Sequence, residues 1–268
     1  MYKIVDSNTN GSKEYNLINN LESEIKRGNT YYEDSNIKIN LNTYREYDTS
    51  IYVADIYISD PILLKTYMAK NSYGKNVTEK TSNMAENVNA IIAINGDYYG
   101  AREKGYVLKN GVIYRNVSAN NQEDLVIYEN GEMEIINEDD ISIEELKMKG
   151  AYNILSFGPG LINNGIITVS ENSEVGRSMA SNPRTAIGKI SDNHYVFVVS
   201  DGRTSENDGL SLYELASFME SIGCITAYNL DGGGSSTMYF NGNIINNPTG
   251  GFKASSERSV SDIVYIGY

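Results

Sequence analysis

Short hydrophobic runs separated by turn residues dominate the chain, and most of them have the length of a strand. Residues 51–58 are rich in β-branched and aromatic side chains and end before Pro61. Residues 90–94 form a continuous apolar run, which is typical of a strand buried on both faces. We expect further strands at residues 125–128, 133–136, 185–190, 195–199, 225–230, 237–240 and 263–266.

Helical periodicity is clearest at residues 211–223. Ser211 and Glu214 have the spacing of a capping box, apolar residues then recur on one face, and Gly223 stands where a C-terminal glycine belongs. Strands outnumber helices, and Asn130-Gly131 marks one of several hairpins. We therefore expect an α+β fold with a large mixed, mostly antiparallel sheet and flanking helices. Shorter helices are expected at residues 12–30, 82–88 and 142–149.

No Pro- or Ser-rich linker divides the 268 residues, so we expect a single catalytic domain at residues 61–268. Residues 1–60 are predicted to be an N-terminal extension that packs on this domain or leads into it. No stretch has the length and apolarity of a membrane span, and residues 1–11 have no hydrophobic signal core. Localisation therefore stays open: extracellular or cell-envelope if an export signal was trimmed from the chain, otherwise cytoplasmic or phage-associated.

The net charge of −13 argues against nucleic acid as a partner, because phosphate neutralisation needs a basic face. An anionic substrate would need a local cluster of Arg or Lys. The one cysteine, Cys224, opens an apolar strand and is expected to be buried and inert. The one histidine, His194, lies in a predicted hairpin turn and is expected to be solvated. Acid–base chemistry would then fall to Asp, Glu or Tyr.

Polar, glycine-bearing loops follow several of the predicted strands, and binding sites are usually built from such loops. The loop at residues 94–100 presents Asn95 and Asp97, although this composition also suits a plain turn. In the segment at residues 182–188, Arg184 stands at the start of a strand, where its planar fork could grip a phosphate. A surface arginine is the competing interpretation.

Two further loops each contain an arginine that is a candidate for binding phosphate. Asp201 and Arg203 follow the strand at residues 195–199, where a structural ion pair is the alternative. Arg258 precedes the last strand and could join the same cleft or merely pair with Glu257.

The most specific segment is residues 228–238, in which three consecutive glycines stand beside a carboxylate and three hydroxyl groups. Glycine allows close approach of the backbone, and successive amides can form an anion-binding concavity. A flexible hairpin loop is the alternative, but a hairpin does not need this composition. The candidate residues of this segment are Asn229, Asp231, Gly232, Gly233, Gly234, Ser235, Ser236 and Thr237.

In order along the chain, the motifs Asn-Gly-Asp-Tyr-Tyr, Pro-Arg-Thr-Ala-Ile-Gly, Asp-Gly-Arg, Asn-Leu-Asp-Gly-Gly-Gly-Ser-Ser-Thr-Met and Glu-Arg-Ser-Val-Ser-Asp resemble those of the phosphodiester glycosidase family. The resemblance covers about residues 85–268, and residues 1–60 match nothing comparable. It implies hydrolysis of a sugar 1-phosphodiester, such as a GlcNAc-1-phosphodiester, to sugar and phosphomonoester. Bacterial members are often described as exopolysaccharide biosynthesis proteins, which implies a setting at the cell envelope.

The division of labour that we expect gives the phosphate to Arg184, Arg203 and the amides of residues 232–234. Asp231 is the first candidate for nucleophile or base and Asp97 the second, with Asp201 paired to an arginine. No cofactor is expected. A glycan- or cell-surface-binding module remains an alternative. So does a metal-dependent phosphodiesterase, in which the three aspartates hold a divalent cation such as Ca²⁺ or Mg²⁺.

Overall fold

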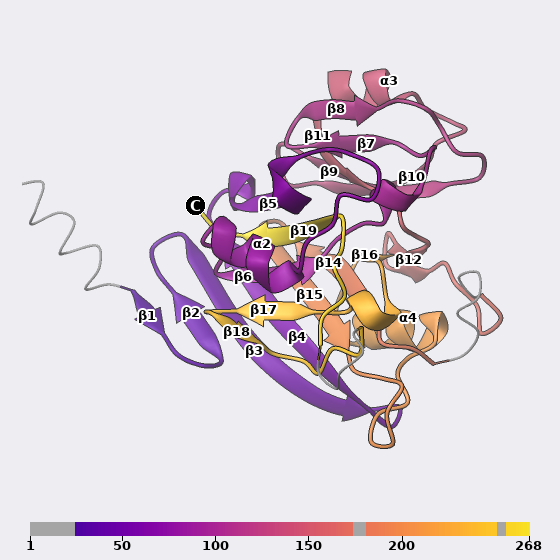
Figure 1. The fold of residues 1–268 in the computed structure, drawn as a ribbon. Helices are drawn as coiled ribbons and strands as arrows, with labels where there is room; N and C mark the ends of the chain where they lie inside the picture. The colour runs from indigo at the N-terminus through magenta and orange to yellow at the C-terminus, as the bar shows by residue number, and fades with distance from the viewer. Residues whose placement is uncertain (1–24, 174–180, 251–255) are drawn as a thin grey trace, which may run out of the picture.

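Antiparallel strands make up most of the regular secondary structure in the computed structural model, which describes residues 25–173, 181–250 and 256–268 (Figure 1). In this part of the chain the strands form sheets of nine, five, three and two strands, and the pairings between them are antiparallel. The predicted α+β fold, rich in antiparallel strands and flanked by helices, is confirmed. The strands divide among several sheets because a strongly twisted sheet rarely grows beyond about ten strands.

The nine-stranded sheet takes its strands from both halves of the chain. β4 pairs with β15 from Ile51 opposite Ser200 to Tyr57 opposite His194, so strands that precede residue 60 lie in the same sheet as later ones. In sheet order the strands are β1 (Lys26–Arg27), β2 (Tyr31–Glu33), β3 (Ile37–Glu46), β4 (Thr49–Ile58), β15 (His194–Ser200), β14 (Thr185–Ser191), β16 (Thr226–Asn229), β12 (Gly160–Asn163) and β13 (Ile166–Ile167).

The five-stranded sheet packs against one face of the nine-stranded sheet. The main core cluster joins Ile56 and Phe197 of the large sheet to Ile94, Met238 and Val264 of the smaller one, and all five side chains are buried. Burial on both sides explains the continuous apolar run of β6. In sheet order the strands are β18 (Asn243–Ile244), β17 (Met238–Phe240), β6 (Ile92–Asn95), β19 (Asp262–Ile266) and β5 (Leu64–Met68).

Two smaller sheets and the helices complete the described structure. The three-stranded sheet comprises β10 (Met133–Asn137), β9 (Glu123–Tyr128) and β11 (Ala151–Leu155), and the two-stranded one β7 (Val107–Lys109) and β8 (Val112–Arg115). The helices are α2 (Thr81–Asn87), α3 (Ile143–Met148) and α4 (Leu212–Ser221), with 3₁₀ turns η1 (Pro61–Leu63), η2 (Ala69–Asn71), η3 (Tyr99–Ala101) and η4 (Gly233–Ser235).

Helix α4 covers the other face of the nine-stranded sheet, where its buried Leu215 and Met219 pack against Val198 and Ala227. The predicted capping box of Ser211 and Glu214 is present. The predicted helix at residues 12–30 is wrong at its C-terminal end, which is strand β1, because its backbone pairs with β2 in an extended register. Residues 12–24 of that prediction lie outside the described residues.

Strand direction brings the candidate loops to one edge. β14 starts at Thr185 opposite Val199 near the end of β15, and Ala186 pairs with Asn229 at the end of β16. The start of one strand and the ends of two others therefore lie side by side. β16 and β17 belong to different sheets, so the glycine segment crosses between sheets and is not a hairpin loop. It meets the end of β6, where Met238 pairs with Ile94.

Two expectations about single side chains have different outcomes. Cys224 is free and buried, so the prediction that it is buried is confirmed, and burial raises the pKa of its thiol to about 12. The prediction of a solvated His194 is wrong. Its ring stacks on Tyr57 with centroids 3.9 Å apart, and its Nε2 lies 2.5 Å from Oδ1 of Asp55, because it belongs to β15 and not to the turn.

Among the described helices, none combines the length and the apolar character that crossing a membrane requires.

Candidate active site

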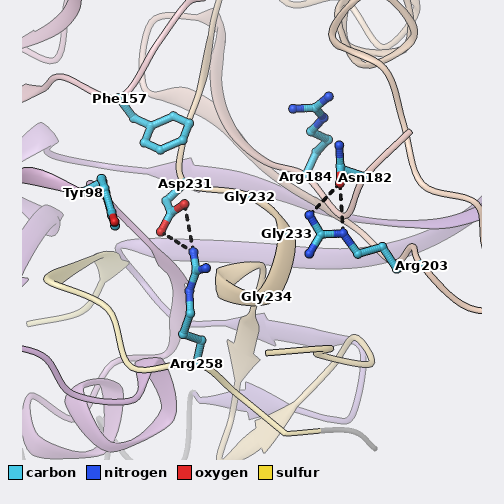
Figure 2. A pocket seen from close by; sticks show the side chains of 10 residues that line it. All are labelled: Tyr98, Phe157, Asn182, Arg184, Arg203, Asp231, Gly232, Gly233, Gly234 and Arg258. Atoms are coloured by element: carbon cyan, nitrogen blue, oxygen red, sulfur yellow. Dashed lines mark hydrogen bonds and ion pairs between the residues drawn. The ribbon is translucent and has the colours of Figure 1, made fainter. Parts of the chain in front are cut away.

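The loops at this edge enclose a cavity of about 680 Å³ (Figure 2). Arg184, Arg203 and Asp231 all line it, although they come from three separate loops. The convergence that the sequence motifs predict is therefore present in the structure. The complete lining is Tyr98, Phe157, Asn182, Arg184, Arg203, Asp231, Gly232, Gly233, Gly234 and Arg258.

The triple glycine forms the floor between the two halves of the cavity. Gly233 has a φ of +60° and donates its N–H to the carbonyl oxygen of Pro183 at 2.7 Å. A Cβ on Gly233 would lie 3.0 Å from Nη2 of Arg203, so glycine is needed for this guanidinium to approach the turn. Gly232 and Gly234 also line the cavity, and their N–H groups donate to no other residue that the structure describes.

Two arginines stand on one side of this turn. Nε and Nη2 of Arg203 donate to Oδ1 of Asn182 at 2.9 and 2.7 Å, which fixes the plane of the guanidinium. Arg184 is buried, and its Nε donates to the carbonyl oxygen of Leu210 at 2.8 Å. A planar guanidinium held in this way is preorganised for a phosphate.

Asp231 and Arg258 form an ion pair on the other side. Nη2 of Arg258 lies 3.1 and 3.0 Å from the two carboxylate oxygens of Asp231, and Ser235 Oγ donates to Oδ2 at 2.6 Å. Burial raises the pKa of Asp231, against the lowering effects of Arg258 and Ser235. Of the two alternatives for Arg258, the structure shows the first: Arg258 lines the cavity, and Glu257 instead accepts hydrogen bonds from Ser82.

Three predicted site residues lie behind the cavity wall instead of lining it. Asn95 donates to the carbonyl oxygen of Asp231 at 2.6 Å, and Asn229 donates to that of Gly158 at 2.7 Å. Asp97 is 1% exposed and accepts hydrogen bonds from the N–H groups of Tyr98 and Ser156, both at 2.8 Å. Their side chains therefore hold neighbouring loops together, and Asp97 does not face a substrate in this cavity.

Asp201 also lies outside the cavity lining. Its carboxylate accepts from Tyr52 Oη at 3.0 Å and from the N–H of Asn247 at 2.8 Å, and burial raises its pKa. The expected pairing of Asp201 with an arginine is wrong, because a tyrosine and a backbone amide occupy its oxygens.

The hydroxyl residues after the glycines are buried. Ser235 bridges Asp231 and Arg258, and its Oγ accepts from Nε of Arg258 at 2.8 Å. Ser236 and Thr237 do not line the cavity, and neither hydroxyl oxygen has a hydrogen-bond partner among the described residues. The N–H of Thr237 donates to Oδ1 of Asn95 at 3.1 Å, which ties the turn to β6.

Sequence reasoning did not select Tyr98, Phe157 and Asn182 as site residues, although all three line the cavity. Tyr98 and Asn182 stand beside chosen residues, so strand-end position could have found them. Phe157 follows β11 in an unremarkable Ser-Phe-Gly-Pro segment, and only the fold places it here. In the described ranges, no group of three or more His, Cys, Asp and Glu residues is placed to hold a metal ion.

The architecture is shared with solved proteins. The catalytic domain of zebrafish N-acetylglucosamine-1-phosphodiester alpha-N-acetylglucosaminidase, auto-inhibited by its pro-peptide, aligns with a TM-score of 0.68 and 20% identity over 87% of this chain and 83% of its own. A hypothetical protein from Synechocystis aligns with a TM-score of 0.61 and 15% identity over 87% of this chain and 62% of its own. These likenesses show the fold, an α+β scaffold that a glycosidase catalytic domain also uses.

The chain belongs to the phosphodiester glycosidase family, whose sequence profile matches residues 88–267. The SPbeta prophage-derived uncharacterized protein YomE of Bacillus subtilis is 32% identical over 203 residues, which are 73% of this chain and 31% of that protein. The mouse N-acetylglucosamine-1-phosphodiester alpha-N-acetylglucosaminidase is 39% identical over 66 residues, 25% of this chain and 13% of that enzyme. The chain thus spans less than a third of the length of either relative.

Proposed function

We propose that this protein hydrolyses a sugar 1-phosphodiester at the anomeric carbon and releases the sugar and a phosphomonoester. The observation that carries the proposal is the arrangement of the cavity. The carboxylate of Asp231 lies between an aromatic side, with Tyr98 and Phe157, and a guanidinium side, with Arg184 and Arg203 (Figure 2). A sugar 1-phosphodiester has a neutral sugar ring on one side of its anomeric glycosidic bond and an anionic phosphate on the other. Its two parts therefore match the aromatic side and the guanidinium side of the cavity.

The guanidinium side and the glycine floor would hold the phosphate. As the bond breaks, charge grows on the departing phosphomonoester, and the fixed Arg203 with the N–H groups of Gly232 and Gly234 would stabilise it. A phosphomonoester is a good leaving group, so the reaction does not need a strong general acid. This fits a cavity in which Asp231 is the only carboxylate among the described lining residues.

Asp231 would act as the nucleophile or as the base for water. In either case a water oxygen finally bonds to the anomeric carbon, the carbon–oxygen bond to phosphate breaks, and its electron pair leaves with the phosphomonoester. The ion pair with Arg258 lowers the pKa of this carboxylate and so opposes the raising effect of burial. Arg258 is half-exposed at the cavity, where it can contact the substrate phosphate as well as Asp231.

The test is turnover of a GlcNAc-1-phosphodiester in ¹⁸O-labelled water. We expect the label in the released sugar, and we expect Asp231→Asn to lower kcat by about 10³-fold or more while the thermal melt stays cooperative. Asp192→Asn, at a carboxylate that is 92% exposed, is the control and should keep wild-type turnover. Near-normal turnover of Asp231→Asn would remove Asp231 from this role.

The same assay separates the alternatives. Label in the phosphomonoester, together with loss of activity in a chelator, would indicate a metal-dependent phosphodiesterase. Binding of sugar phosphodiesters with no turnover of any would indicate a glycan-binding module.

A further inference from the structure

Tyr98 and Phe157 form an aromatic corner at one end of the cavity. Their ring centroids are 6.5 Å apart and their planes meet at 83°, so the two rings stand edge to face. Tyr98 is 44% exposed although its neighbours in the chain are buried. The corner lies on the Asp231 side of the glycine turn, away from Arg184 and Arg203 (Figure 2).

The carboxylate of Asp97 holds both halves of this corner. Its Oδ1 accepts from the N–H of Tyr98 at 2.8 Å. Its Oδ2 accepts from the N–H of Ser156 at 2.8 Å and from Ser156 Oγ at 3.1 Å. Because Ser156 directly precedes Phe157, a single side chain fixes the backbone at the base of both rings.

Asp97 is itself held by a buried ion pair. Its N–H donates to Oδ1 of Asp262 at 2.6 Å, and Oδ2 of Asp262 lies 2.7 Å from Nζ of Lys109. The same ammonium lies 3.9 Å from Oδ2 of Asp97. All three side chains are at most 2% exposed. Buried charges are tolerated only when they are paired and hydrogen-bonded, so this triad has little freedom to move.

Arg102 braces the second half of the corner from behind. Its Nη1 donates to the carbonyl oxygen of Ser156 at 2.7 Å, and its Cζ lies 5.7 Å from the centroid of the Phe157 ring. The guanidinium therefore occupies one face of Phe157, and the ring keeps another part of its surface for the cavity that it lines.

We infer that the aromatic corner is the subsite for the neutral pyranose ring and that Asp97 is its positioning residue. Rigid aromatic rings bind the C–H faces of a sugar with little loss of conformational entropy, and they attract no phosphate. The inference rests on the proposed function for the orientation of the substrate. It assigns sugar recognition to residues that the anion-binding arginines do not contact, so the two affinities should separate.

The chain has no tryptophan, which makes Phe157→Trp a unique indole in the corner. Titration of this variant with N-acetylglucosamine should change the fluorescence emission of the tryptophan, and the change should reach saturation. Addition of Asp97→Asn places an amide N–H₂ against backbone N–H donors, so the sugar Kd should rise about tenfold. The Kd for inorganic phosphate, measured by calorimetry, should stay within about twofold of its value without Asp97→Asn.

A remote indole and a second variant serve as controls for this experiment. Tyr31→Trp places the only indole on an exposed remote strand and should not respond to the sugar. If Asp97→Asn fails to give a cooperative melt, Tyr98→Ala in the Phe157→Trp background replaces it, because that variant leaves the buried triad intact. It should raise the sugar Kd by a similar factor. Equal loss of sugar and phosphate affinity, or an indole that does not respond to the sugar, would overturn the inference. A clean separation of the two affinities without any turnover of phosphodiesters would keep this subsite and refute the proposed hydrolysis.

Discussion

The carboxylate of Asp231 and the guanidinium of Arg258 are paired through one nitrogen, whose distances to the two carboxylate oxygens are 3.1 and 3.0 Å. The partners differ in burial, because the Asp231 side chain is 9% exposed and that of Arg258 44%. The pair therefore has a fixed acidic member and a cationic member that solvent reaches. Such an arrangement lets Arg258 interact with an incoming phosphate without moving the carboxylate.

The first prediction concerns the pH dependence of this pair. A nucleophile or base must be ionised, so kcat/KM should rise with pH through the pKa of Asp231, which burial raises above its ordinary value. Arg258 lowers this pKa, so Arg258→Met should raise it further and move the acidic limb to higher pH. The loss in kcat/KM should thus be larger at pH 5 than at pH 8. Arg45→Met, at an arginine that bonds Asn207 outside the cavity, should leave the limb in place. A limb that moves to lower pH would contradict the assignment.

The second prediction concerns the glycine floor. Gly233→Ala introduces a Cβ 3.0 Å from Nη2 of Arg203 at a φ of +60°. Gly165→Ala is a matched control, because Gly165 has a φ of +75° and nothing within 4 Å of its Cβ position. Both variants should lose about 1–2 kcal/mol of unfolding free energy from the left-handed backbone. Only Gly233→Ala should also raise KM for the phosphodiester, by about tenfold, through displacement of Arg203. Equal kinetics in the two variants would exclude a role for this contact.

The sequence predicts which loops meet more reliably than it predicts which side chains face the cavity. Hydrophobic runs followed by polar loops identify strand ends, and the antiparallel pairing of β14 with β15 and β16 then brings Arg184, Arg203 and Asp231 to one edge. The hydrophobic periodicity and the composition of the loops reveal where strands end, because each strand must bury its apolar residues. The side-chain direction beyond the last residue of a strand has no such periodic signal.

Asn95 and Asp97 illustrate the second case. Asn95 ends β6 and Asp97 lies two residues beyond it, and both are polar residues beside glycine, which is also the pattern of a site residue. Their partners are the backbone of Asp231 and of Ser156, which lie far away in the chain. Only the assembled fold shows that these side chains satisfy buried donors and acceptors under the loops. Sequence alone also gives no partner for Lys109, whose buried ion pair with Asp262 depends on two sheets meeting.

The third prediction separates Asp201 from the chemistry. Asp201→Asn leaves one oxygen acceptor for two donors, Tyr52 Oη and the N–H of Asn247. It should lower the unfolding free energy by about 1–3 kcal/mol, because a buried donor loses its partner. Turnover of the folded variant should stay within about threefold of wild type, since Asp201 does not line the cavity. Denaturant melts and steady-state kinetics on the same preparation test both statements. A loss of kcat as large as that of Asp231→Asn would return Asp201 to the catalytic candidates.

The fourth prediction concerns Asp124 on β9, which is 0% exposed. Neither carboxylate oxygen makes a hydrogen bond of ordinary geometry among the described residues, although Glu138 and Gln122 lie close enough to affect its pKa. Burial, and then the charge of the neighbouring Glu138, raises the pKa of Asp124 well above its ordinary value. The folded protein therefore holds a proton there that the unfolded chain releases above about pH 4. Because the native state binds more protons, stability should fall as pH rises from there toward the raised pKa.

Asp124→Asn removes this titration while keeping the shape of the side chain. The variant should melt at a higher temperature than wild type at pH 7, by a few degrees or about 1–2 kcal/mol, and the difference should shrink toward pH 4. Asp140→Asn, at an exposed carboxylate in the turn after β10, should reproduce the wild-type pH dependence. Calorimetric melts from pH 4 to pH 8 measure the slopes. A steeper decline of melting temperature with pH in Asp124→Asn than in wild type would show that the carboxylate is stabilised as an anion, in conflict with its raised pKa.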